Sequence, residues 1–292
     1  MSFCPSLARN GILREKQRLV YMREESKRSR KKLQCGMRIA IFNQKGGVGK
    51  TTTTLNLAAA IVCEGGNPLL LDLDPQCHLT GIHGGTPRDS SHSLYGFYLA
   101  LRGLDELAVP WEGVGRIVPS HQQLIKVDSM FGKGPSVLNK LRTGLDAIDA
   151  PPPGIAAQST LIDCCPYVGL LALNAIFACD VLLIPVSTDY LSLQAALQMT
   201  RTLDILEPVL KRRLERRYLL TRYDGRRRMS GDVQNRLRSH YTHEVCETVI
   251  SENVAVAESP SKNRDVFSHS PSSKGAKDYA ALYQELLHQG FL

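Results

Sequence analysis

The sequence predicts a doubly wound α/β fold, with one mostly parallel β-sheet covered by helices on both faces. Short apolar runs of strand length alternate with helical segments from residue 37 to the C-terminus, as in a parallel sheet buried on both sides. A glycine-rich loop joins the first of these strands to the first helix, and acidic residues end two later strands. Loops and strand ends of this kind form ligand sites in doubly wound sheets.

The individual elements follow from the apolar runs and their boundaries. The first strand is expected in MRIAIFN, just before Gln44, and the others at residues 68–74, 159–164, 181–186, 218–221 and 244–250. Helices are expected at residues 50–63, about 191–213 and about 276–288, with further helical sequence between the third and fourth strands. The first helix stops at Gly65 and Gly66, because glycine enters the left-handed conformation at low cost.

Positive charge is concentrated in two blocks. Residues 1–36 contain ten Lys/Arg and three Glu, and residues 211–238 contain eleven Lys/Arg and three acidic residues, whereas the whole chain has a net charge of only +8. We expect residues 1–36 to be a basic N-terminal extension that is disordered or precedes the natural start at Met37. A basic helix lying on a membrane or on nucleic acid is the alternative. Residues 37–292 are expected to form one domain, with a loop at the prolines 151–153.

Composition excludes several classes of protein. A hydrophobic fraction of 43% with 22% charged residues is typical of a soluble globular chain. The longest apolar run, about residues 168–186, is interrupted by Asn174 and Asp180, so it does not predict a membrane span. No secretory signal is expected at the N-terminus. The eight cysteines show no metal-binding spacing, which favours reduced thiols in a cytosolic protein.

The stretch NQKGGVGKTTTTLN, residues 43–56, has the spacing of a phosphate-binding loop. A strand, a glycine-rich turn and a helix N-terminus direct backbone N–H groups at one point, which favours an anion. In the pattern G-x-x-x-x-G-K-[ST], Lys50 is expected to reach the β- and γ-phosphates and the Thr51 hydroxyl to bind Mg²⁺. Gln44 replaces the first glycine of that pattern.

Three aspartates follow or end predicted strands. Asp72 and Asp74 belong to the run LLLDLD, and Asp163 belongs to TLID. The carboxyl ends of parallel strands meet where ligands of such sheets bind. One or two of these carboxylates are therefore expected to hold Mg²⁺, and another to orient the attacking water.

These motifs also carry a resemblance to a known family. KGGVGKTT, LDLDPQ and LIDCCP with GLLALNA look like the ParA/MinD family of deviant Walker A P-loop ATPases, and most like its ParA (Soj-like) partitioning ATPases. The likeness continues in order through LLTRYDGRRRMS, NVAVAESPS and SKGAKDY, and it spans nearly all of residues 37–292. Cys165 stands where the family commonly has a proline, and Tyr167 replaces a small residue.

The resemblance implies an ATPase that uses Mg²⁺ and ATP and works as a homodimer. In similar proteins the lysine that matches Lys45 reaches across a twofold interface to the phosphates of the other subunit. Asp74 there activates or orients water, and Asp72 and Asp163 support Mg²⁺. Catalysis is thus assigned to Lys45, Lys50 and Asp74. Nucleotide contacts are assigned to Gly46, Gly47, Val48, Gly49, Lys50, Thr51, Thr52, Pro260 and Ser261. Of these, Pro260 and Ser261 are expected to lie against adenine.

DNA contacts are expected in the second basic block. Clustered positive charge suffices for non-specific binding, although arginine-rich helices are often only solvated faces. Partition ATPases often carry arginines in the segment where this chain has Glu252 and Ala255, so one family DNA contact is missing. The contacts are therefore assigned to Arg222, Arg226, Arg227 and Arg228.

The leading hypothesis is an ATPase that coats DNA as an ATP dimer and positions a plasmid, a chromosome origin or a protein cluster. A ParB-like partner would stimulate hydrolysis, and the protein would be cytoplasmic and nucleoid-associated when ATP is bound. A MinD-like membrane ATPase is the first alternative, but the C-terminal AALYQELLHQGFL has no Lys or Arg for an anchor. A reductase resembling the nitrogenase iron protein is the second, and it would need two cysteines per subunit in interface loops.

Overall fold

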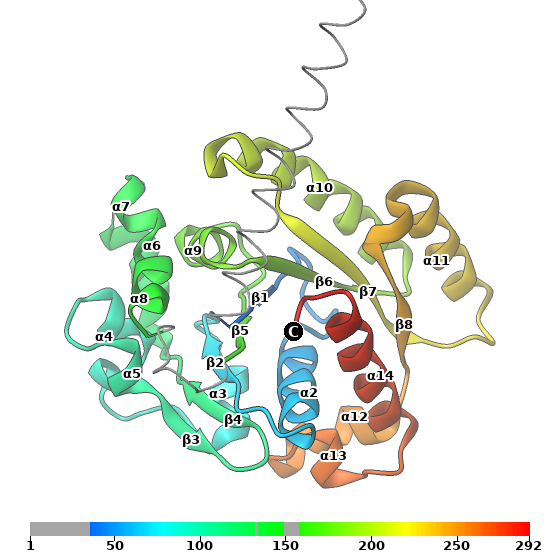
Figure 1. The fold of residues 1–292 in the computed structure, drawn as a ribbon, viewed down its shortest axis with the longest axis horizontal. Helices are drawn as coiled ribbons and strands as arrows, with labels where there is room; N and C mark the ends of the chain where they lie inside the picture. The colour runs from blue at the N-terminus through cyan, green and yellow to red at the C-terminus, as the bar shows by residue number, and fades with distance from the viewer. Residues whose placement is uncertain (1–35, 132–133, 149–157) are drawn as a thin grey trace, which may run out of the picture.

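Eight strands form one sheet in the computed structural model, which describes residues 36–131, 134–148 and 158–292 (Figure 1). Their order across the sheet is β3-β4-β2-β5-β1-β6-β7-β8. Neighbouring strands are parallel except β3 and β4, which are antiparallel. The strands are β1 (Arg38–Ile41), β2 (Leu69–Asp72), β3 (Val109–Trp111), β4 (Gly115–Val118), β5 (Thr160–Asp163), β6 (Val181–Ser187), β7 (Glu215–Tyr223) and β8 (Val245–Ser251).

Helices cover both faces of this sheet, with α2 and α14 on one face and α9, α10 and α11 on the other (Figure 1). Short helices and 3₁₀ turns fill the connections. The α-helices are α2 (Lys50–Cys63), α3 (His78–His83), α4 (Leu94–Tyr98), α5 (Leu104–Leu107), α6 (Val127–Met130), α7 (Pro135–Leu138), α8 (Lys140–Ile148), α9 (Leu170–Ala178), α10 (Tyr190–Leu210), α11 (Arg228–Tyr241), α12 (Val254–Glu258), α13 (Val266–His269) and α14 (Lys274–His288). The 3₁₀ turns are η1 (Ser90–His92), η2 (Gln122–Lys126), η3 (Thr242–Glu244) and η4 (Ser259–Lys262).

Two hydrophobic cores result from the alternation of side chains along the strands. In and just after β1, Ala40 and Phe42 belong to the core beneath α9 and α10, while Ile39 and Ile41 belong to the core beneath α2 and α14. All four are fully buried or nearly so. Successive residues of a strand point to opposite faces, so a strand that is covered on both sides must be apolar throughout.

The predicted fold class is confirmed, and the predicted strands and long helices occur at their expected places. The hairpin of β3 and β4, the short helices between β2 and β5, and helix α11 were not predicted. The basic segment before residue 36 and the prolines at 151–153 lie outside the described residues. Within the described ranges, no helix combines the length and the hydropathy needed to span a bilayer.

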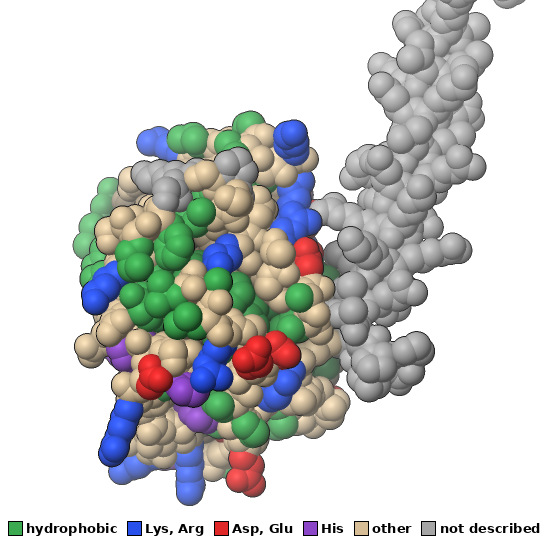
Figure 2. Space-filling view, turned by 90° about the vertical axis from the view of Figure 1, so that its left-hand side faces the viewer, with side chains coloured by type: hydrophobic (Ala, Val, Ile, Leu, Met, Phe, Trp, Pro, Cys, Tyr) green, Lys and Arg blue, Asp and Glu red, His purple; other side chains and the backbone are tan. Residues whose placement is uncertain are grey.

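Hydrophobic side chains gather on the surface at the edge of the molecule that carries β3 and helices α4 to α8 (Figure 2). Ile125 in η2 and Met130 in α6 are exposed there. The carboxylate of Asp128 in α6 accepts a hydrogen bond from the N–H of Leu170, the first residue of α9. This bond joins the edge to the loop before α9, where Tyr167 is 70% exposed.

Candidate nucleotide-binding site

The glycine-rich loop between β1 and α2 forms one wall of a pocket of about 450 Å³. Gly47 and Gly49 have φ angles of 74° and 90°, in the left-handed region that glycine adopts readily. Helix α2 begins at Lys50 without a side-chain cap. The first backbone N–H groups of the helix therefore remain available to an anion in the pocket.

Lys50 lies between the loop and the acidic strand ends. Its ammonium donates a hydrogen bond to the carbonyl oxygen of Lys45 at 3.0 Å, across the inside of the loop. Burial lowers the pKa of Lys50, and the negative charges of Asp163 and Asp74 act in the opposite direction. A phosphate group in the pocket would provide this buried ammonium with a stronger charged partner.

Asp72 and Asp163 lie opposite each other at the adjoining ends of β2 and β5. The carboxylate of Asp72 accepts hydrogen bonds from the N–H and the hydroxyl of Thr80, at 2.8 and 2.6 Å, and from the N–H of Asp74 at 3.1 Å. Burial raises the pKa of Asp72 to about 6. Asp72 is thus already used to hold the chain that follows β2.

Asp163 differs from Asp72 in having free oxygens. Both of its carboxylate oxygens are buried and make no hydrogen bond of normal geometry with the described residues, and only the nearby hydroxyl of Thr51 partly offsets the rise in pKa. Burial, and next the charge of Asp72, raise the pKa of Asp163 well above its usual range. An orphaned carboxylate beside the Thr51 position of a phosphate loop is the oxygen ligand that Mg²⁺ requires. The residues present therefore fit a Mg²⁺ ion, with Asp163 as the carboxylate best placed to support it.

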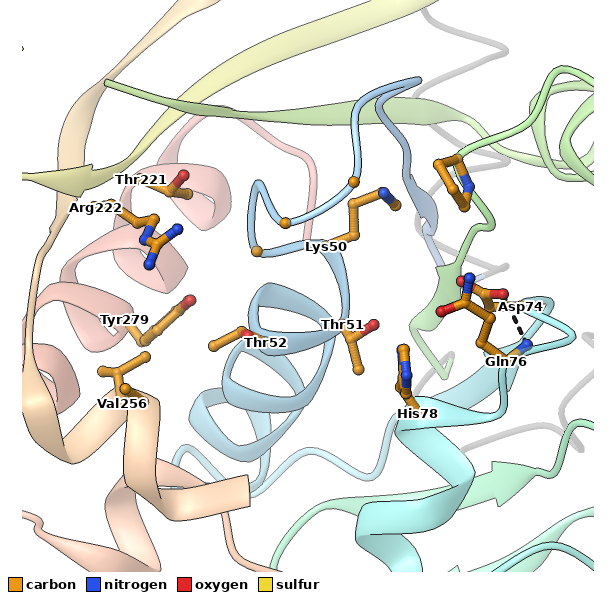
Figure 3. Close-up of a pocket in the computed structure, with 15 residues that line it drawn as sticks. Lys50, Thr51, Thr52, Asp74, Gln76, His78, Thr221, Arg222, Val256 and Tyr279 are labelled. Carbon is orange, nitrogen blue, oxygen red and sulfur yellow. Dashed lines mark hydrogen bonds between the residues drawn. The ribbon is translucent and has the colours of Figure 1, made fainter. Parts of the chain in front are cut away.

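Asp74 reaches the pocket from the loop after β2. One of its oxygens accepts a hydrogen bond from the N–H of Gln76 at 2.9 Å, and the residue is only 7% exposed. Figure 3 shows Asp74, Gln76 and His78 on one side of the pocket, facing Lys50 and Thr51 at the start of α2. His78 and Gln76 were not predicted, although they follow the predicted Asp74 closely in the sequence.

The opposite end of the pocket is formed by residues from distant parts of the chain. Thr52, which was predicted, lies there beside side chains of β7, α12 and α14 that were not predicted to contact the nucleotide (Figure 3). The lining residues at this end are Thr52, Thr221, Arg222, Val256, Ala257 and Tyr279. Pro260 and Ser261, expected against adenine, do not line this pocket, and the preceding turns of the same segment line it instead. Val48 is buried beneath the loop.

The ammonium of Lys45 is held by the start of α10. It donates hydrogen bonds to Oδ1 of Asp189 at 2.6 Å and to Oγ of Ser192 at 2.8 Å. Although partial burial opposes the change, hydrogen bonds from Lys45 and Ser192 lower the pKa of Asp189 to about 2. Lys45 must leave these two partners before it can contact anything outside its own subunit.

The predicted DNA-contact residues fall into two places. Arg222 lies in the wall of the pocket, whereas three arginines at the start of α11 lie on the surface, each beside an acidic residue. Arg227 pairs with Glu252 at 2.9 Å. The acidic residue that marks the departure from the family therefore neutralises one of the arginines expected to compensate for it. The three surface arginines are Arg226, Arg227 and Arg228.

The fold and the pocket define a P-loop nucleotide-binding protein, and comparisons with known proteins identify its family. A family model for an AAA domain matches residues 36–216. The chain is 35% identical over 254 residues to the chromosome-partitioning ATPase Soj of Thermus thermophilus, and the match covers 86% of this chain and 95% of Soj. It is 34% identical over 254 residues to the chromosome partitioning protein ParA of Myxococcus xanthus, covering 86% and 88%. The protein therefore belongs to the ParA/Soj family of chromosome-partitioning ATPases.

A solved structure has the same fold. The crystal structure of cobyrinic acid a,c-diamide synthase from Mycobacterium smegmatis, with a bound ATP analogue and magnesium, matches with a TM-score of 0.74 and 27% identity. The match covers 87% of this chain and 95% of that chain. The predicted family is confirmed, and the ligands of that crystal structure are the ones expected for this pocket.

Replacing Asp163 with Asn is expected to raise the stability of the metal-free protein. The substitution removes the negative charge from one of two adjacent buried carboxylates, and a gain is expected because burial and the charge of Asp72 both disfavour the ionised form of Asp163. In EDTA the melting temperature should rise by roughly 3–10 °C. Added Mg²⁺ with ADP should stabilise the wild type but not the variant. Asp204→Asn, on the exposed side of α10, is the matched control and should change neither value; a lower melting temperature for Asp163→Asn would contradict this account.

The same gain is expected to depend on pH. Because the folded-state pKa of Asp163 is raised well above its usual range, the metal-free wild type binds more protons than its unfolded chain once the pH exceeds about 3.9, the pKa of an unfolded aspartate. The stability contributed by protonated Asp163 is therefore present at low pH and is lost as the pH rises, whereas Asp72 titrates in both proteins. The difference in melting temperature between Asp163→Asn and wild type, measured in EDTA, should be large at pH 7.5 and small at pH 5. An equal difference at both pH values would show that charge is not the cause.

Proposed function

We propose that this protein is an ATP-dependent dimerising ATPase that binds DNA non-specifically and drives segregation or positioning of plasmid or chromosomal DNA with a ParB-like partner. In this proposal it is cytoplasmic and associates with the nucleoid when ATP is bound. The observation that supports the proposal is the pocket, in which the phosphate loop and Lys50 face Asp74. The buried carboxylate of Asp163 lies close enough to act on the charge of Lys50 and makes no hydrogen bond among the described residues.

Hydrolysis is assigned to residues at the acidic end of the pocket. Mg²⁺, when bound, would screen the charge of the phosphates and of the transition state. Thr51 and Asp163 are the residues that would hold it. Lys50 neutralises the transferred phosphoryl group, while Asp74, anchored by the N–H of Gln76, orients the attacking water. Asp72 contributes indirectly, because it fixes the chain between β2 and α3.

Dimerisation is assigned to the surface around Lys45. Tyr190 and Leu191, next to the Asp189 partner of Lys45, are 53% and 66% exposed. Apolar residues that surround a charged group are typical of a specific interface. In a closed C₂ dimer each Lys45 would exchange Asp189 for the phosphates bound by the other subunit, and hydrolysis would remove the γ-phosphate that holds it there.

Lys45→Ala is expected to keep nucleotide binding but to lose ATP-dependent dimerisation and turnover. Lys50→Ala is expected to lose binding itself, because it removes the ammonium inside the phosphate loop. Asp189→Asn is the control, since asparagine preserves the N-terminal cap of α10 while weakening only the contact within the subunit. Calorimetry with ATP measures nucleotide binding, light scattering measures dimerisation, and phosphate release measures turnover. A normal ATP dimer of Lys45→Ala, or a dimerisation defect in Asp189→Asn equal to that of Lys45→Ala, would rule out the role across the interface.

DNA binding is assigned to the start of α11. The side chains of Arg226 and Arg228 are 92% and 95% exposed, and their partners Asp224 and Asp232 belong to the same turn or helix. Exposed ion pairs of this kind contribute little stability, so a phosphate group can replace the carboxylate at low cost. Two protomers would present two such surfaces to one duplex.

Replacing Arg226 and Arg228 together with Gln is expected to weaken DNA binding steeply while nucleotide binding is unchanged. The dependence of log K on log salt should flatten by about 0.9 for each phosphate that the variant no longer neutralises. Arg102→Gln with Arg142→Gln, at the opposite edge of the sheet, is the matched control for charge. Deletion of residues 1–36 tests the basic extension separately. Salt titrations with a non-hydrolysable ATP analogue measure all variants. Loss of binding on truncation alone would move the DNA contact to the extension.

The iron-dependent alternative finds no support in the cysteines. Cys164 and Cys165, which follow β5, are 1% and 5% exposed. Burial raises the pKa of the Cys165 thiol to about 11 and that of the Cys164 thiol well above its usual range. Buried neutral thiols are poor ligands for a cluster shared at a subunit interface.

A further inference from the structure

The loop between β5 and α9, residues 164–169, forms part of the nucleotide site but has few contacts of its own. It begins next to Asp163, and its Pro166 lines the pocket. Tyr167 is 70% exposed. Within the described part of the chain, residues 165–168 make no backbone-to-backbone hydrogen bond. The position of Pro166 therefore depends on how the two ends of this loop are held.

One end of the loop is held by the sheet and the other by a side chain from α6. The N–H of Cys164 donates a hydrogen bond to the carbonyl oxygen of Ile41 in β1 at 3.3 Å. At the other end, the N–H of Leu170 donates to Oδ1 of Asp128. The N-cap residue of α9 is Gly169, which has no side chain to cap the helix. Asp128 takes the place of that cap, and its negative charge suits a helix N-terminus.

The contact between Asp128 and α9 requires a glycine at residue 169. A Cβ atom on Gly169 would overlap the carboxylate of Asp128. The backbone of Gly169 is extended, with a φ angle of −108°, and other residues adopt this conformation without strain. Glycine is therefore needed here because of the approach of Asp128 and not because of the backbone conformation.

The segment that carries Asp128 is anchored at the other acidic loop of the site. It starts at Ser120, just after β4, whose buried hydroxyl donates to the carbonyl oxygen of Asp74 at 2.7 Å. The N–H of Ser120 donates to the hydroxyl of Thr80 at 2.8 Å, and that hydroxyl donates in turn to Asp72. One stretch of chain therefore contacts both the loop after β2 and the loop after β5.

We propose that Asp128 is a positioning residue of the nucleotide site. It fixes the loop after β5, so that Asp163 can support Mg²⁺ and Pro166 keeps its place in the pocket wall. Asp128 does not itself line the pocket. A misplacement of about 1 Å that originates far from the reacting atoms can lower a rate by about 100-fold, so a contact outside the pocket can control turnover. The inference rests on the proposed nucleotide binding and adds a residue that governs how Mg²⁺ strengthens it.

The test compares Asp128→Ala and Gly169→Ala with wild type. Calorimetry measures the affinity for ADP in EDTA and with Mg²⁺, and phosphate release from ATP measures kcat. The first variant removes the carboxylate, and the second displaces it while adding a better helix former. Both should lose roughly tenfold of the affinity that Mg²⁺ adds, as expected for one hydrogen bond to a charged group, and roughly 10–100-fold in kcat. Affinity in EDTA should be unchanged.

Two further variants separate positioning from packing. Asp128→Asn keeps an oxygen that accepts from Leu170, so it should recover most of both losses. Tyr98→Phe is the matched control. The hydroxyl of Tyr98 is buried close to Cys164 and Cys165 and has no hydrogen-bond partner among the described residues. Its removal should therefore change neither the Mg²⁺-dependent affinity nor kcat.

A Mg²⁺-dependent gain and a kcat of Asp128→Ala that both stay within about twofold of wild type would overturn the proposal. An equal loss of ADP affinity in EDTA would do so too, because the contact would then serve general stability. A loss in Tyr98→Phe as large as that in Asp128→Ala would assign the effect to packing. If wild type bound no ADP in either condition, the proposed function itself would fail, and this inference with it.

Discussion

Two buried carboxylates, Asp72 and Asp163, lie side by side where β2 and β5 end. The site depends on the difference in hydrogen bonding between them. Asp72 accepts three hydrogen bonds and so fixes the chain that carries Asp74 into the pocket. Asp163 accepts none from the described residues. An interior position of this kind is costly for an ionised group, and the cost falls when a cation arrives. The fold thus holds an arrangement that is more favourable with ligands than without them, as active sites often do.

The phosphate loop sits between two sets of contacts that lead to different parts of the molecule. On one side Lys50 faces the strand-end acids, and on the other Thr221 ties the carbonyl of Val48 to β7. Lys45 adds a third connection, to the start of α10. The loop is therefore in direct contact with α10 and β7. These shared contacts give a physical basis for coupling nucleotide state to surfaces remote from the phosphates.

Much of this site could be predicted from the sequence because its chemistry is local. The loop from Lys45 to Thr52 and the acids that end two strands are short motifs, and the parallel sheet brings them to one edge. The pocket wall remote from Asp74 could not be predicted, since Val256 and Tyr279 approach the loop only through the packing of α12 and α14. The difference in hydrogen bonding between Asp72 and Asp163 could not be predicted either. Thr80, which donates two hydrogen bonds to Asp72, lies eight residues further along the chain. Arg222 belongs to the same basic block as its neighbours in the sequence, yet it lines the pocket, at a residue whose φ angle is 52°.

The ion pairs of the second basic block bear on how DNA binding would be switched. Eleven Lys/Arg within 28 residues suggest a strongly positive surface, yet the arginines at the start of α11 each have an acidic neighbour, including Glu252 from beyond β8. The field of one protomer is therefore weaker than the count of arginines implies, and its affinity for a duplex should be low at physiological salt. Joining two such surfaces makes the second contact intramolecular and multiplies the affinity without any new residue. If the protein binds DNA as proposed, partial neutralisation of this surface would make binding depend more sharply on the proposed ATP dimer.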